Sequence, residues 1–78
     1  MLDTQSLEWL MARERLKDQA ATLEQQAETI LACFDRLERE PTAAERDARR
    51  EAYLENRALL HELQSEIDAI GRRVGAAH

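Results

Sequence analysis

The chain has 78 residues, of which 35% are charged and only 4% aromatic, and its formal net charge is −5. A chain of this length forms at most one domain and buries only about 60% of the surface that its unfolded form exposes. The acidic balance lacks the positive charge that nonspecific nucleic-acid binding requires, and a single cysteine excludes an internal disulfide. Because a thin core needs further support, we expect self-association or a partner protein.

The N-terminal residues and the hydropathy pattern indicate where the protein resides. The sequence starts Met1-Leu2-Asp3, without the basic and apolar regions of a secretory signal. Its longest uncharged run falls well short of the ~18 residues of a membrane span. We therefore expect a cytoplasmic protein with no membrane contact, and a lone free thiol fits a reducing compartment.

A long amphipathic helix is predicted over residues 4–39. Its start is marked by Asp3, Thr4 and Ser6, whose side-chain oxygens can accept hydrogen bonds from the unpaired N–H groups of a first turn. Apolar residues then recur at alternating spacings of four and three, which places them on one stripe of a helix that packs against another helix. These residues are Leu16, Ala20, Leu23, Ala27, Ile30, Phe34 and Leu37.

The strongest break in the sequence is Glu40-Pro41-Thr42, where we predict a tight turn. Proline disfavours helical backbone in the residue before it, so the first helix is not expected to continue through Glu40. Thr42 and Glu45 then form a capping-box pattern, in which each side chain can bond the other residue's backbone N–H. A second helix is therefore predicted over residues 43–74, with an apolar stripe made of Tyr53, Leu60, Leu63, Ile67, Ile70 and Val74.

Two such helices joined by a turn at residues 40–42 predict an all-α fold, an antiparallel and coiled-coil-like helical hairpin that occupies residues 1–78 as a single domain. Back-to-back packing pairs Phe34 with Arg49, and it places Asn56 opposite Ala27 in the seam. A polar residue in such a seam commonly sets the register or the oligomeric state at some expense in stability. We expect the hairpin to form a four-helix bundle, either as a dimer or with a partner.

Apolar residues outside the seam indicate a contact surface. Near the N-terminus, Leu7, Leu10 and Met11 project away from the stripe that Trp9 continues, so one antiparallel helix cannot cover them all. Exposed Trp, Leu and Met side chains on a helix are typical anchors of a helix-in-groove interface, and they also suit the core of a homodimeric four-helix bundle. The predicted partner-binding residues are Leu7, Trp9, Leu10, Met11, Leu31, Leu54 and Leu59.

Features of a catalytic or ligand-binding site are sparse. Cys33 precedes Phe34 and is interpreted as a buried structural cysteine, because its charged neighbour Asp35 does not activate a thiol. The sequence contains no Glu-x-x-His pair, glycine-rich phosphate loop or nucleophile motif. It thus predicts a protein that is not an enzyme, with no catalytic residue, no metal site and no cofactor.

Arginines gather around the predicted turn and interleave with carboxylates, which predicts a solvated, salt-bridged face. A phosphate-binding or RNA-binding tip is the alternative, and it ranks below protein binding because the net charge is −5. Arg49 differs from the others, since its stem is expected to lie along Phe34. The five arginines are Arg36, Arg39, Arg46, Arg49 and Arg50.

Residues 53–70, YLENRALLHELQSEIDAI, resemble the leucine-paired helices of small flagellar and type III secretion chaperones. Those proteins are short, acidic, mostly cytosolic and helical, and they cover an amphipathic helix of a secreted subunit until export. The hairpin also resembles the dimeric RNA-binding regulator of plasmid copy number, a family that presents basic residues on an outer helix face. The first resemblance implies a client-docking surface made of Tyr53, Leu54, Leu59, Leu60 and Leu63.

The leading expectation from the sequence is a small non-catalytic protein-binding module, such as a chaperone, adaptor or inhibitor, whose binding energy comes from buried Leu, Ile, Trp and Met side chains. One alternative is a structural homodimeric four-helix bundle without a client. Another is an RNA-binding regulator that uses the arginine-rich turn.

Overall fold

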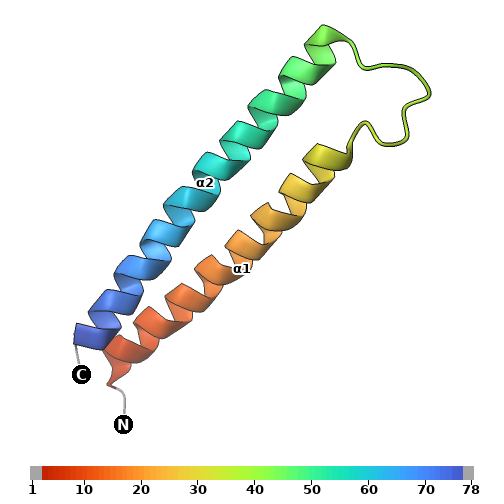
Figure 1. Ribbon diagram of the computed structural model, residues 1–78. Helices are drawn as coiled ribbons and strands as arrows, with labels where there is room; N and C mark the ends of the chain where they lie inside the picture. Colours follow the sequence, from red (N-terminus) through yellow and green to blue (C-terminus); the bar gives the residue numbers. More distant parts are fainter. Residues whose placement is uncertain (1–2, 77–78) are drawn as a thin grey trace.

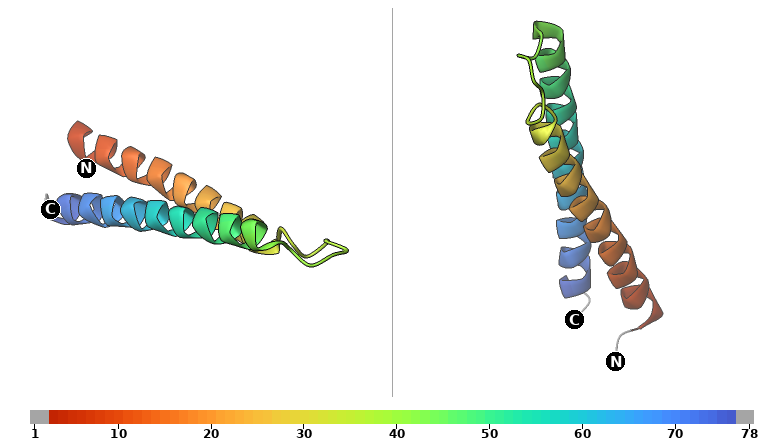
Figure 2. Two further views of the ribbon diagram at one scale, coloured as in Figure 1. Left: turned by 90° about the horizontal axis from the view of Figure 1, so that it is seen from above. Right: turned by 90° about the vertical axis from the view of Figure 1, so that its right-hand side faces the viewer.

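The computed structural model describes residues 3–76, which fold into two long helices that pack against each other (Figure 1). Helix α1 spans Thr4–Ala32, helix α2 spans Ala43–Ala76, and residues 33–42 connect them. The helices run in opposite directions and cross at a shallow angle (Figure 2). The prediction of an all-α chain with two packed helices is confirmed for the described residues.

Asp3 caps the start of α1, as one of the predicted cap residues. Its Oδ1 atom accepts a hydrogen bond from the backbone N–H of Ser6 at 2.7 Å. Its backbone carbonyl accepts a hydrogen bond from the N–H of Leu7 at 3.1 Å. A side-chain acceptor at this position satisfies a first-turn N–H group and typically stabilises a helix by ~1 kcal/mol.

The first helix ends at Ala32 and not at Arg39, so its predicted C-terminal end is wrong. Beyond it, the backbone N–H groups of Cys33, Asp35 and Leu37 donate to carbonyls three residues back, which is typical of tight turns. A longer α1 would face the first turn of α2, Ala43-Ala44-Glu45-Arg46, which offers only small and charged side chains. Since little apolar surface would be buried there, packing does not favour a longer helix. The turn predicted at residues 40–42 is instead a connection over residues 33–42.

The capping box predicted at the start of α2 is present. The Thr42 hydroxyl accepts a hydrogen bond from the Glu45 N–H at 3.1 Å, and the Glu45 carboxylate accepts one from the Thr42 N–H at 2.9 Å. The guanidinium of Arg39 donates to both carboxylate oxygens of Glu45, at 2.7 and 2.9 Å. Two hydrogen bonds lower the pKa of Glu45 from 4.5 to about 2: the one from Arg39 has the largest effect, and the one from the Thr42 backbone N–H comes second. Through Arg39 and Thr42, Glu45 thereby links the connection to the first turn of α2.

Acid should weaken this end of the hairpin. A carboxylate with a lower pKa in the folded than in the unfolded chain stabilises the fold above its unfolded pKa, and the contribution is lost as the pH falls through the folded pKa. For Glu45 the loss therefore runs from pH 4.5 down to about 2. We expect Glu45→Gln to remove this part of the pH dependence of the thermal midpoint, followed by circular dichroism. Glu38→Gln is the control in the connection, and identical profiles for the two variants would contradict the prediction.

The core is one thin seam between the helices. The predicted α1 stripe is buried or half-buried from Leu16 to Phe34, but Leu37 is exposed because it lies in the connection. The Arg49 guanidinium lies 4.4 Å from the centroid of the Phe34 ring, as the predicted pairing of these two residues requires. Among the described residues, the buried apolar side chains are Ala27, Leu60 and Ile70.

Asn56 is buried in this seam and bonds directly to α1. Its Nδ2 donates to the Leu23 carbonyl at 2.9 Å, and its Oδ1 accepts from Nε and Nη2 of Arg57 at 3.1 and 2.9 Å. The Leu23 carbonyl is the group that accepts the Ala27 N–H within α1. The Asn56 side chain therefore bonds to α1 at the backbone carbonyl of Leu23, one turn before its predicted neighbour Ala27.

Two substitutions at Asn56 should have opposite effects on stability. Asn56→Leu removes a buried polar group and leaves the Leu23 carbonyl bonded within α1, so we expect the free energy of unfolding to rise by on the order of 1 kcal/mol, with weaker control of register. Asn56→Asp places a carboxylate oxygen against that carbonyl, and we expect a loss of about 2 kcal/mol. Urea unfolding followed by circular dichroism measures both. A lower midpoint for Asn56→Leu would mean that the hydrogen bonds of Asn56 stabilise the fold more than a buried leucine side chain does.

Candidate protein-interaction surfaces

The hairpin is a rod whose sides are open to solvent. Its extents are 59 × 17 × 12 Å and its radius of gyration is 17.9 Å, compared with about 11.5 Å for a compact chain of this length. Its accessible surface is 6219 Å², compared with about 4,850 Å² for a folded monomer of 9.0 kDa. Two helices alone thus leave about 1,400 Å² more surface exposed than a compact fold would.

Large apolar side chains contribute to this surface on both helices. Five of the predicted partner-binding residues are exposed, whereas Trp9 and Leu10 are half-buried. The exposed large apolar residues are Leu7 (51%), Met11 (58%), Leu31 (51%), Leu37 (37%), Leu54 (59%) and Leu59 (46%).

The N-terminal apolar residues of α1 divide between two faces. Leu7 and Met11 are one turn apart and therefore share a face, and both are exposed. Trp9 faces α2 instead, where the guanidinium of Arg73 lies 5.0 Å from its ring centroid. Leu10 is half-buried and belongs in part to the fold itself. The N-terminal patch therefore consists of Leu7 and Met11, the two exposed residues of this group.

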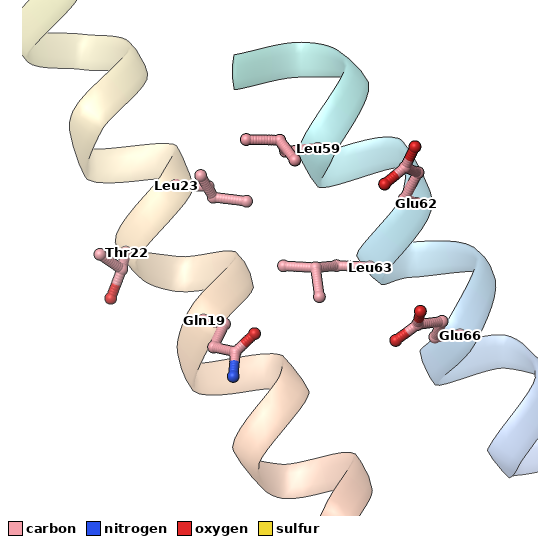
Figure 3. A pocket seen from close by; sticks show the side chains of 7 residues that line it. All are labelled: Gln19, Thr22, Leu23, Leu59, Glu62, Leu63 and Glu66. Atoms are coloured by element: carbon pink, nitrogen blue, oxygen red, sulfur yellow. The ribbon is translucent and has the colours of Figure 1, made fainter. Parts of the chain in front are cut away.

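A groove of about 380 Å³ lies along one flank of the hairpin. Leu23 of α1 and Leu59 and Leu63 of α2 point into the space between the helices (Figure 3). Leu59 and Leu63 are one turn apart and therefore form one side of this apolar floor. The remaining lining residues are polar and form the rim: Gln19 and Thr22 on α1, and Glu62 and Glu66 on α2.

The predicted partner-binding set contains Leu59 but neither Leu23 nor Leu63, which the apolar stripes of the two helices assign to the seam. Both are half-buried, so each contributes to the seam and to the groove. The sequence signal that could have shown this is the spacing of Leu59 and Leu63, together with the uncharged neighbours Gln19 and Thr22 on α1.

A second depression lies nearer the connection, and Leu31 lines this one whereas Leu59 lines the groove. Leu31 and Tyr53 are its apolar residues. Leu54 lines neither this depression nor the groove. The predicted set of Leu31, Leu54 and Leu59 is therefore not one patch. The charged residues of the second depression are Arg46, Asp47, Arg49 and Arg50.

Several arginines of the predicted turn already have partners within the chain. Arg39 is bonded to Glu45, and Nη2 of Arg50 lies 3.7 Å from Oδ1 of Asp47. Arg49 covers the Phe34 ring and donates to the Leu31 carbonyl at 3.3 Å. The prediction of a salt-bridged face is thus confirmed for Arg39 and Arg50.

The thiol of Cys33 is exposed, so the prediction of a buried cysteine is wrong. The reason is that α1 ends at Ala32, which moves Cys33 out of the seam and into the connection. Among residues 3–76, no group of three or more His, Cys, Asp or Glu side chains is placed to hold a metal ion. Over the same residues, neither helix contains a segment long and apolar enough to cross a membrane.

Comparison with family models, with curated proteins and with solved structures found no match to this chain. Among the residues that the resemblance to export chaperones implicates, Leu54 and Leu59 are exposed, and Tyr53 and Leu63 are half-buried. Leu60 is buried in the seam, so its assignment to a client-docking surface is wrong for the hairpin as it folds here.

Proposed function

We propose that the chain is a small, cytoplasmic, non-catalytic module that binds another protein through its exposed apolar side chains, as a chaperone, adaptor or inhibitor does. The observation that supports this best is the accessible surface of 6219 Å², about 1,400 Å² above the value for a compact monomer. A specific interface covers about 800 Å² on each partner. The excess is therefore large enough for one or two helices to dock, and burying it would add stability that the thin seam lacks.

A structural homodimer is the second candidate, in which two hairpins form a four-helix bundle without a client. It is supported by the apolar residues in two separate depressions, Leu31 in one and Leu59 in the other. Two open sides suit a bundle in which each helix contacts more than one neighbour.

Sedimentation velocity of the purified chain, combined with thermal melting, tests the proposal. At micromolar concentrations we expect a strongly helical species that associates or melts without cooperativity, and that gains a cooperative transition when its client is added. A stable dimer that melts cooperatively by itself would favour the structural homodimer. A compact monomer with a cooperative melt would contradict both candidates, because its exposed apolar surface would then need no partner.

A further inference from the structure

We propose that the groove floored by Leu23, Leu59 and Leu63 binds an amphipathic helix that carries two basic residues, Lys or Arg, one turn apart on one flank. The proposal rests on the protein-binding function above and specifies the chemistry of the partner. The leucines come from both helices and point into one elongated space (Figure 3). A third helix laid along α1 and α2 would cover all three, which is the usual way in which an amphipathic helix binds a groove.

The two rims of the groove differ in charge. The α1 rim is uncharged, and the Thr22 hydroxyl already donates to the Asp18 carbonyl at 3.1 Å. The α2 rim consists of Glu62 and Glu66, which are one turn apart on the same face. Like charges at this spacing slightly destabilise a helix. Within residues 3–76, neither carboxylate takes part in an ion pair.

A partner helix with a basic flank would complement the difference in charge between the two rims. Two cations at positions i and i+4 would match the spacing of Glu62 and Glu66, and neutral polar residues would suit the opposite flank, beside Gln19. Burial of the leucines would supply most of the affinity, whereas the carboxylates would select a basic partner over an acidic one. The charge of the α2 rim therefore determines which helices the groove accepts.

A second copy of the chain fits the groove less well through the Leu7 face of α1 or through its own groove. The exposed helix face that contains Leu7 continues with Glu14 and Asp18, so docking that face would oppose carboxylates to the rim. If two grooves faced each other, Glu62 and Glu66 of both copies would surround one seam. Like charges opposed across an interface disfavour that pairing.

The test uses two labelled helical peptides and the full chain. Both peptides carry leucines on one face, and one flank bears either two lysines or two glutamates at positions i and i+4. Fluorescence anisotropy measures their affinities at about 0.01 M and about 1 M salt, where the Debye length falls from about 30 to about 3 Å. We expect the lysine peptide to bind about tenfold more tightly at low salt, and this preference to shrink at high salt.

Variants of the chain identify the groove as the binding site. Glu62→Gln with Glu66→Gln should lower the affinity for the lysine peptide about fivefold. The control, Glu38→Gln with Glu40→Gln in the connection, changes net charge equally and should have less than about a twofold effect. Leu59→Ser should weaken binding of both peptides about tenfold. Leu54, which is also exposed but lies outside the groove, should tolerate serine. Circular dichroism checks that each variant remains helical.

The outcomes separate this proposal from the general one. Equal binding of the two peptides, with the Glu62/Glu66 variant behaving like its control, would overturn the charge selection and leave the protein-binding function intact. A chain that dimerises, with the dimer weakened by Leu59→Ser, would overturn the proposal by showing that a second copy occupies the groove. A stable monomer that binds neither peptide would overturn both proposals.

Discussion

Replacing Leu60 with alanine should unfold a large fraction of the protein. Leu60 is 5% exposed and is one of the few buried apolar residues in the described part of the chain. A buried Leu→Ala substitution typically lowers the free energy of unfolding by about 2–5 kcal/mol. A core in a chain of about 70–80 residues rarely supplies more than about 3–5 kcal/mol. We therefore expect loss of most of the helical circular dichroism signal at micromolar concentration.

The neighbouring residue provides a matched control for this prediction. Leu59 is 46% exposed and lies in the groove, so Leu59→Ala should lower the free energy of unfolding by less than about 1 kcal/mol. Urea titrations of the two variants make the comparison. Equal effects at Leu59 and Leu60 would show that α2 does not present the described face to α1.

Replacing the N-terminal patch, Leu7 and Met11, with serine should weaken association by about tenfold or more. Burying two such side chains is worth ~1.5–3 kcal/mol each before the costs of association are subtracted. The sequence groups Leu10 with Leu7 and Met11, but Leu10 is half-buried whereas Leu7 and Met11 are exposed. Because Leu7 and Met11 both lie outside the seam, we expect helicity to persist. Concentration-dependent sedimentation and circular dichroism of the double variant measure the two quantities.

The control for this double variant is Ala21→Ser with Gln25→Ser, because these residues are also exposed and one turn apart on α1. It introduces the same two serines into the same helix without removing a large apolar side chain. If the Leu7/Met11 variant associates as strongly as its control, the interface lies elsewhere, and Leu31, Leu54 and Leu59 become the residues to test. Loss of helicity in the Leu7/Met11 variant alone would mean that the patch belongs to the fold.

Features that depend on contacts between near neighbours in the chain can be predicted from the residue types alone. The Asp3 cap and the Thr42–Glu45 capping box join residues three positions apart, so their residue types suffice to predict them. The stripe from Leu16 to Phe34 follows from helical spacing, which is also a local property. Pro41 likewise predicts where the connection lies, because proline acts on its immediate neighbours in the chain. It does not predict how long the connection is.

Other features depend on where α2 lies beside α1, and the residue types alone do not predict them. α1 ends at Ala32 because the first turn of α2 offers little apolar surface to a longer helix, and this leaves Cys33 exposed. Residues beside the seam, such as Leu31 and Leu59, are separated into two depressions by the placement of the second helix. Helical spacing shows how far a residue lies from the seam, but only the packed partner helix shows what lies across from it. The groove with its acidic rim could therefore be recognised only once both helices were in place.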